Sequence, residues 1–327
     1  MAEAAGVSVT TVSRYLNGRL VLPGDTSARI DDAIRVLAYQ PNPHARRLSL
    51  GRSEAIGLVI PDIANPFFAI LADAIQQEAE AEGFELLIST TRNRIGRELA
   101  DLARFGRERT EGVLFVTNHA DDGTLARAIA GGGATVLLDE DVAGTDVPKL
   151  FVDNEAGGRL AARHLIARGH RRLGILGGPP GLLSSNERHG GFHAAVAEAG
   201  GDCRVVFEDF GDYTAARGRA AAHGMFDLAS PPTAVFATSD ETALGLLDAA
   251  QARGVAVPRC LSVVAFDDIG PWHLLDPPLT AIRQPVEALG RGGVRLLLGA
   301  MKRQPAGAIA RLPVKLVERG SVAPPLT

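Results

Sequence analysis

The stretch "AGVSVTTVSRYLNG", residues Ala5–Gly18, decides which fold the chain begins with. On a helical wheel Val12, Tyr15 and Leu16 fall on one arc, whereas short polar side chains and one arginine fall on the opposite arc. Ser8 is placed to cap this helix by accepting from backbone N–H groups of the first turn. Short hydroxyl side chains on an exposed face suit close approach to phosphates and base edges, so the pattern predicts a DNA-binding helix.

A second helix is predicted over about Thr26–Ala38, with Asp25 or Thr26 as its cap. Its apolar residues recur at spacings of three and four, and the expected buried stripe is Ile30, Ala33, Ile34 and Leu37. Two short helices joined by small residues indicate a helix-turn-helix with a third, supporting helix. On this pattern alone, a generic three-helix cap remains the alternative.

Charge is unevenly distributed along a chain of ordinary globular composition, 46% hydrophobic and 22% charged. The first 50 residues hold six arginines against four acidic residues, a net charge of +2. Since the whole chain carries −4, the remainder carries −6. A small basic head on an acidic body indicates that the head binds an anion.

From Gly51 onward, nine short apolar runs alternate with helical stretches, from "AIGLVI" (55–60) to "LSVVAFD" (261–267). Continuous β-branched and leucine-rich runs are typical of parallel strands that are buried on both faces. This number exceeds one ordinary doubly wound sheet, so the sequence predicts two α/β subdomains. A ligand cleft is expected between them, at the carboxyl ends of the strands.

Polar and aromatic side chains follow many of these runs, where the cleft would form. Carboxylates that accept two hydroxyl groups, an arginine and aromatic faces that stack on a ring are what a sugar or nucleoside requires. The candidate effector-binding residues are Asn65, Phe67, Phe68, Asp139, Ser184, Arg188, Tyr213, Ser239, Asp240 and Asp267. Arg188 and Asp267 have the fewest structural explanations, whereas Asp240 could equally cap a helix and the phenylalanines could fill the core.

The opening stretch, together with "YQPNPHARRLSLGRS" (39–53), resembles the DNA-binding head and hinge of the lactose-repressor (LacI/GalR) family of bacterial transcription regulators. The segments "DIANPFF", "SSNERHGGF", "SDETALG" and "VVAFDDI" resemble that family's effector-binding core, which is akin to periplasmic sugar-binding proteins. The resemblance covers almost the whole chain. It implies an N-terminal all-α helix-turn-helix head and a periplasmic-binding-protein-like α/β core of two doubly wound parallel-sheet subdomains.

For the head and the hinge, the resemblance implies a role in binding operator DNA. The base-reading positions would be Val9, Thr10 and Arg14, and the residues near phosphates would be Ser8, Thr11, Ser13 and Asn17. An arginine bonds guanine O6 and N7 bidentately, and valine or threonine meets a thymine methyl. The segment Pro41–Leu50 resembles the family's hinge helix, in which Leu48, with Ala45 beside it, would wedge open the minor groove.

For the core, the resemblance implies that Arg188 and Asp267 hold the effector, that Asp139 and Gln284 assist and that Tyr213 stacks. Family members often carry asparagine where this chain has Ser239. Because serine lacks an amide that donates and accepts at once, the effector is expected to differ from common hexoses.

The expected domains are a head over residues 1–41, a hinge over 42–51 and an effector-binding and dimerisation domain over 52–327. Subdomain N would comprise about 52–152 and 283–313, and subdomain C about 153–282 and 314–327. The resemblance implies chain crossings near 151–153, 281–283 and 313–317. Family members usually carry several residues before the position of Met1, so a start upstream is expected, as is weak DNA binding by the sequence as printed.

The predicted function is a cytoplasmic, homodimeric transcription regulator, a repressor, controlled by a sugar-like effector; pairing of dimers into tetramers is left open. The alternative is a stand-alone sugar-binding protein without effective DNA binding. An enzyme is the third possibility, but no paired nucleophile and base stands out, and no cofactor or metal is predicted. His189 and His193 have a metal-ligand spacing without an evident third ligand. No signal peptide or membrane-spanning run is visible, and Cys203 and Cys260 are expected to be buried thiols.

Overall fold

The computed structural model describes residues 1–16, 20–37, 39, 53–105, 110–302 and 309–326. The chain divides into two compact units, Met1–Glu54 and Ala55–Thr327. Among the described residues, no helix is long and apolar enough to cross a membrane.

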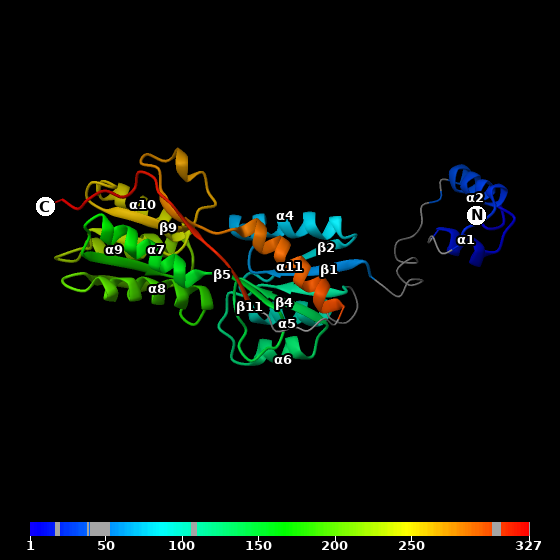
Figure 1. The fold of residues 1–327 in the computed structure, drawn as a ribbon, viewed down its shortest axis with the longest axis horizontal. Helices are drawn as coiled ribbons and strands as arrows, with labels where there is room; N and C mark the ends of the chain where they lie inside the picture. Colours follow the sequence, from blue (N-terminus) through cyan, green and yellow to red (C-terminus); the bar gives the residue numbers. More distant parts are fainter. Residues whose placement is uncertain (17–19, 38, 40–52, 106–109, 303–308, 327) are drawn as a thin grey trace. The chain divides into compact units, whose positions relative to one another are not determined.

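Among the described residues of the first unit are two helices, α1 (Val9–Leu16) and α2 (Gly24–Val36) (Figure 1), which pack around a small apolar core. That core consists of Ala5, Val12, Ile30 and Ala33, with Tyr15 and Leu16 partly buried against it. The Tyr15 hydroxyl also donates to the Asp31 carboxylate of α2 at 3.1 Å, which ties the two helices together.

The predicted cap of α1 is confirmed, whereas that of α2 is wrong. Ser8 Oγ accepts from the Thr11 amide at 3.1 Å. Helix α2 begins at Gly24, and its N-cap position is held by Pro23, whose side chain has no acceptor, so no side-chain hydrogen bond caps the helix. Leu37 is 51% exposed in this unit rather than part of the buried stripe, since the helix ends at Val36.

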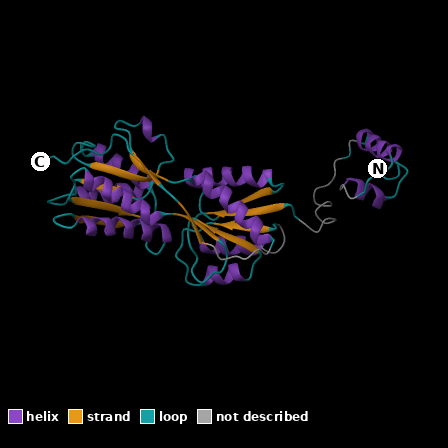
Figure 2. Cartoon of the chain, in the orientation of Figure 1, coloured by secondary structure: helices purple, strands orange, loops and turns teal. Residues whose placement is uncertain are grey.

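The second unit contains two six-stranded sheets, each covered by helices on both faces (Figures 1 and 2). In the first sheet all neighbours run parallel, in the order β11 (Ile309–Leu312), β5 (Lys149–Val152), β4 (Ala134–Leu138), β3 (Gly112–Phe115), β1 (Ala55–Ile60), β2 (Glu85–Thr90). The second sheet has the order β12 (Lys315–Val317), β10 (Thr280–Arg283), β9 (Ser262–Asp267), β8 (Ala234–Ala237), β6 (Arg172–Gly177), β7 (Arg204–Phe210), with β12 antiparallel to β10. All nine apolar runs of the sequence form strands, as predicted.

Each sheet has two apolar cores, one on each face. On the first sheet, α4 (Pro66–Ala81) and α11 (Val286–Met301) cover one face, and α5 (Ile95–Arg104) and α6 (Thr124–Ala130) cover the other. On the second, the pairs are α7 (Asn154–Ala167) with α8 (Leu183–Ala199), and α9 (Ala215–Phe226) with α10 (Asp240–Ala252). A short 3-10 helix, η2 (Trp272–Leu274), precedes β10. The predicted fold class is confirmed.

The chain passes between the two sheets three times. It leaves the first sheet after β5, returns between β10 and α11, and leaves again between β11 and β12. Each half of this unit is therefore built from segments that are far apart in the sequence.

Two glycines let the backbones of helices α7 and α8 come into direct contact. A Cβ atom on Gly158 would lie 2.1 Å from the Arg188 carbonyl oxygen, and one on Gly191 would lie 2.0 Å from the Glu155 carbonyl oxygen. Only a residue without a side chain fits there. This close contact sets the position of α8, the helix that carries Arg188.

Candidate functional site

A cavity of about 370 Å³ lies where the carboxyl ends of strands from both sheets meet. Ten of the eleven predicted effector residues line it: Asn65, Phe67, Phe68, Asp139, Ser184, Arg188, Tyr213, Ser239, Asp267 and Gln284. The parallel topology explains this convergence, since parallel strands place their carboxyl ends on one edge of a sheet. Two sheets that face each other along these edges enclose a shared site.

Arg188 is the central cation of the cavity and is held from several sides. Its Nε donates to Asn154 Oδ1 at 2.9 Å and its Nη1 to the Thr238 carbonyl at 2.7 Å. The guanidinium lies 3.8 Å from the Phe266 ring centroid, and Nη1 lies 3.8 Å from Asp267 Oδ1. The side chain is therefore fixed before any ligand binds, which lowers the entropic cost of binding.

Two neighbouring carboxyl groups, Asp139 and Glu140, follow β4 and enter the cavity from the first sheet. Burial raises the pKa of Asp139 to about 6, with the charge of Asp267 acting in the same direction and that of Arg188 against it. Burial and the charge of Asp139 raise the pKa of Glu140 to about 8. At neutral pH, Glu140 therefore holds a proton, and Asp139 is largely charged.

Hydrogen bonds connect the two sides of the cavity. The Ser184 amide donates to Glu140 Oε2 at 3.2 Å, the Ser184 hydroxyl bonds Glu140 Oε1, and that hydroxyl lies 3.3 Å from the Tyr213 hydroxyl. Gln284 Nε2 donates to Asp267 Oδ1 at 2.5 Å. These contacts hold the polar groups of the cavity in a defined arrangement.

Three buried polar atoms on the cavity wall have no hydrogen-bond partner among the described residues. They are Asp139 Oδ1, Gln284 Oε1 and His119 Nε2. Leaving a buried polar atom unpaired costs roughly 1–3 kcal/mol. A ligand that offers several O–H or N–H groups would supply the missing partners.

The lining of the cavity is acidic. It contains six carboxyl groups, those of Asp62, Asp139, Glu140, Asp212, Glu241 and Asp267, whereas Arg188 is the one lysine or arginine among its described residues. Even with Glu140 neutral, this lining repels an anion. The wall therefore disfavours an anionic ligand.

Asp240 is the candidate effector residue that does not line the cavity. Its Oδ2 accepts from the Ile269 amide at 2.8 Å and from Trp272 Nε1 at 2.7 Å, so the carboxyl faces the loop after β9. Burial and the charge of Asp267 raise its pKa to about 8. Asp240 thus supports the loop that follows Asp267.

Some predicted cavity residues also have local structural roles. Asn65 Oδ1 accepts from the Phe67 amide at 2.9 Å and so caps α4, and Ser239 Oγ caps α10 by accepting from the Thr242 amide. Phe67 and Phe68 meet edge to face at 5.2 Å between centroids, and both are buried. These residues line the cavity and shape its wall at the same time.

The sequence analysis missed several lining residues: Asp62, Asn93, Asn118, His119, Glu140, Pro179, Asp212, Thr214 and Glu241. Asn93 follows β2, and Asn118 and His119 follow β3, so reading every strand end would have found them. Glu140 stands directly after the predicted Asp139.

On the head, the predicted DNA-contacting face of α1 is accessible. Val9 is 75% exposed, Thr10 and Arg14 are exposed, and Thr11 and Ser13 are half-buried. Ser8 is exposed and uses its hydroxyl to cap the helix. The other predicted DNA contacts, Asn17, Ala45 and Leu48, lie outside the described residues.

Comparison with known proteins identifies both the head and the domain that contains the cavity. Residues 1–42 match the family of bacterial regulatory proteins, lacI family, and residues 162–322 match a periplasmic binding protein-like domain. The HTH-type transcriptional repressor PurR of Serratia proteamaculans (strain 568) is 34% identical over 334 residues, which are 99% of this chain and 96% of that protein. The chain belongs to the LacI family.

Solved structures of LacI-family members have the same fold. The lac repressor dimer bound to operator and the anti-inducer ONPF matches with a TM-score of 0.90 and 28% identity, covering 98% of this chain and 97% of that one. The complex of the transcriptional regulator CelR with cellobiose matches with a TM-score of 0.76 and 30% identity, covering 98% of each chain. This LacI-family chain is a DNA-binding transcriptional regulator controlled by a small-molecule effector, and not an enzyme.

Two expectations of the sequence analysis are corrected by the structure. Cys203 is half-buried and Cys260 is exposed, so the two thiols are not core residues; apolar neighbours in sequence did not place them inside. The pair His189 and His193, set aside for lack of a third ligand, has one in the fold, which is considered below.

Proposed function

We propose that this regulator is a homodimeric repressor whose effector is an uncharged sugar, or a related polyhydroxylated molecule, bound in the cavity between the two sheets. The observation that carries the proposal is the set of unpaired buried atoms Asp139 Oδ1, Gln284 Oε1 and His119 Nε2 in an acidic wall. Hydroxyl groups pair with such atoms, whereas phosphate or carboxylate groups would meet repulsion.

In this proposal Arg188 and Asp267 hold neighbouring hydroxyl groups of the effector, and Asp139 and Gln284 accept from others. The aromatic faces of Phe67 and Tyr213 border the cavity and can stack on a ring. The same faces favour a nucleoside as the second candidate, because a planar base also stacks and offers N–H donors. Neither candidate carries a negative charge, which the acidic wall disfavours.

On the DNA side, we assign base reading to Val9, Thr10 and Arg14, and phosphate contacts to Ser8, Thr11 and Ser13. The exposure of Val9, Thr10 and Arg14 on α1 supports the base-reading assignment, since the major groove accepts one helix. Asn17, Ala45 and Leu48 keep the roles that the family resemblance implies. A two-fold operator requires two copies of the head, which supports a dimer, and binding to a bacterial operator places the protein in the cytoplasm.

Control by the effector follows from the position of the cavity between the two sheets. A ligand that bridges both halves favours one relative orientation of them, and we propose that this orientation sets operator affinity. Because coupling is reciprocal, operator DNA must change effector affinity by the same factor.

The deciding experiment is a thermal-shift screen of the full chain against uncharged monosaccharides and disaccharides, their phosphates, and nucleosides. A ligand at 100 times its Kd raises the free energy of unfolding by about 3 kcal/mol, enough for a clear rise in Tm. We expect an uncharged sugar to raise Tm and its phosphate to have no effect. Stabilisation by a phosphorylated sugar in preference to the free sugar would contradict the proposal.

A gel-shift assay with DNA from upstream of the protein's own coding region then tests the operator. Binding should be specific against scrambled competitor and should change on addition of the ligand found in the screen. Ligand binding without any effect on DNA binding would instead favour a stand-alone sugar-binding protein.

A further inference from the structure

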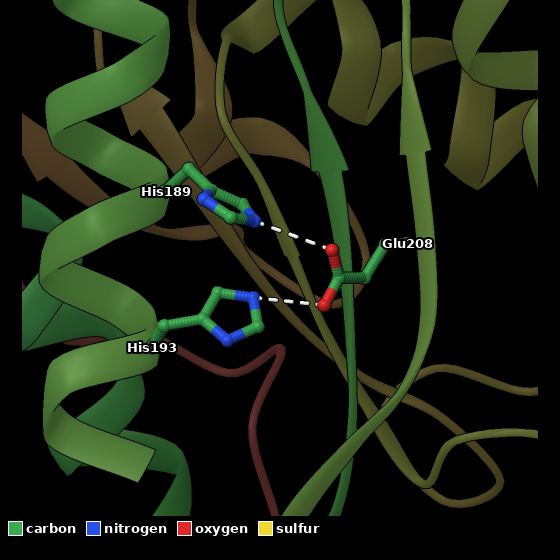
Figure 3. Close-up of side chains that lie close together, drawn as sticks. All are labelled: His189, His193 and Glu208. Atoms are coloured by element: carbon green, nitrogen blue, oxygen red, sulfur yellow. Dashed lines mark hydrogen bonds and ion pairs between the residues drawn. The ribbon is translucent and has the colours of Figure 1, made fainter. Parts of the chain in front are cut away.

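A cluster of two histidines and one glutamate lies outside the effector cavity, between α8 and the edge strand β7 (Figure 3). His189 and His193 stand four residues apart on α8, so their side chains lie on the same face of the helix. Glu208 lies on β7 and points toward both imidazole rings. The three side chains come from two elements that are separated in sequence.

The three atoms that could coordinate an ion lie close together in the structure. His189 Nε2 lies 3.2 Å from Glu208 Oε2, His193 Nε2 lies 2.8 Å from Glu208 Oε1, and all three ligand atoms are within 4.8 Å of one another. Around a tetrahedral zinc ion with bonds of about 2.0–2.1 Å, neighbouring ligand atoms stand roughly 3.3 Å apart. Small side-chain rotations therefore suffice to enclose an ion.

We propose that His189, His193 and Glu208 bind one divalent transition-metal ion of the zinc, nickel and copper class. Two imidazole nitrogens and one carboxylate oxygen suit these borderline ions, whereas magnesium and calcium prefer sets of oxygen ligands alone. Three protein ligands leave a coordination position open for water or another ligand.

The surroundings of the histidines support metal binding. His193 Nε2 is a buried atom, and its neighbour is Glu208 Oε1 at 2.8 Å. Burial lowers the pKa of His193, with the nearby His189 acting in the same direction and Glu208 against it. A metal ion between the rings and the carboxylate would be coordinated by the imidazole nitrogens that face Glu208.

The cluster remains accessible to an ion from solvent. The side chains of His189, His193 and Glu208 are 30%, 36% and 35% exposed. The rings of His189 and His193 lie 4.2 Å apart between centroids, and His189 also packs edge-on against Phe210 at 5.0 Å. The site is thus partly ordered by packing and open on one side.

A bound ion would cross-link α8 to β7. Helix α8 carries Ser184 and Arg188, and the segment after β7 carries Asp212 and Tyr213, all of which line the cavity. The metal site would therefore restrain both segments from outside the cavity. Zinc binding itself does not depend on the proposed sugar effector, because none of its three ligands lines the cavity.

The test is a titration of the tag-free full chain with Zn²⁺, measured by calorimetry in competition with a chelator and without effector or DNA. We expect one Zn²⁺ per chain at this site. The variants His189→Gln, His193→Gln and Glu208→Gln should each weaken that binding at least tenfold. The matched control is His273→Gln, which alters an exposed histidine of η2 and should leave zinc affinity unchanged.

Two further measurements separate a metal site from a structural ion-pair cluster. Co²⁺ should give the visible absorption of a site with nitrogen and oxygen ligands, and His193→Gln should abolish it. Zn²⁺ should slow amide exchange in both α8 and β7 of the unaltered protein but not in His193→Gln. The proposal is overturned if the unaltered protein binds no Zn²⁺, or if binding survives unchanged in the double variant His189→Gln/His193→Gln.

Discussion

Glu140 accepts hydrogen bonds from both the backbone amide and the hydroxyl of Ser184, and so joins the end of β4 in one sheet to the start of α8 beside the other. This contact crosses the effector cavity. It also involves a carboxyl group whose pKa is raised to about 8, so its strength depends on pH within an accessible range.

The unfolding free energy should fall as pH rises because of Glu140. Its carboxyl keeps a proton in the folded state up to about pH 8, whereas the unfolded chain loses that proton near pH 4.5. Between these values the folded state binds more protons, so stability decreases by about 1 kcal/mol per pH unit. Urea unfolding at pH 5, 7 and 9 should show this slope in the unaltered protein and a smaller slope in Glu140→Gln. Asp139 and Asp240 account for a residual slope, because burial raises their pKa values as well. Equal slopes in both proteins would contradict the assignment.

Replacing Arg188 should separate effector binding from DNA binding. Arg188→Ala removes the central cation and leaves Asn154 Oδ1 and the Thr238 carbonyl without their donor, so it should also cost roughly 3–5 kcal/mol of stability. At a temperature where the variant remains folded, operator affinity should stay near that of the unaltered protein while the thermal shift by effector disappears. Arg253→Ala, on an exposed ion pair, is the control and should change neither property. Loss of operator affinity equal to the loss of effector binding would refute this division of roles.

Replacing Arg14 should weaken operator binding and leave effector binding unchanged. A bidentate arginine–guanine contact is worth about 1–3 kcal/mol, so Arg14→Ala should weaken operator binding by roughly 5- to 150-fold for each head that makes the contact. Arg35→Ala removes an exposed arginine of α2 that pairs with Asp32, and it serves as the control for lost charge. Gel-shift titrations at fixed salt compare the two variants. If they lose the same affinity, Arg14 contributes charge rather than base recognition.

Adjacent glycines of α8 offer a matched test of the helix contact that positions Arg188. Gly191→Ala would place its Cβ atom 2.0 Å from the Glu155 carbonyl oxygen, so α7 and α8 must separate, at a cost of about 1–3 kcal/mol or more. Gly190→Ala meets no atom within 4 Å and should stabilise the helix by up to about 1 kcal/mol. Chemical unfolding measures both changes. Similar effects of the two variants would show that the close approach is not needed.

The sequence predicted the architecture well because its signals are local. Runs such as "AIGLVI" become strands with every residue buried, and the residues directly after them converge on the cavity through parallel topology alone. The cap of α1 was also readable, because Ser8 and Thr11 are neighbours along the chain.

The features that sequence reasoning missed depend on distant residues. Glu208 lies 15 residues after His193 in the sequence. The two side chains meet only because β7 pairs with β6 and so lies beside α8. The partners of Asp240, Ile269 and Trp272, lie 29 and 32 residues further along the chain, so its position at the start of α10 gave no sign of where the carboxyl points. The start of α2 depended on Pro23 rather than on a polar cap.

The three passages of the chain between the sheets have a consequence for how this protein is made. The sheet that begins with β1 is completed only when β11 leaves the ribosome, after β6 to β10 of the second sheet have been made. Until then β5 lacks its outer neighbour, and its hydrogen-bonding edge stays open to water or to a chaperone. A chain that ended before β11 would therefore leave both sheets without an edge strand, rather than release one half as a finished piece.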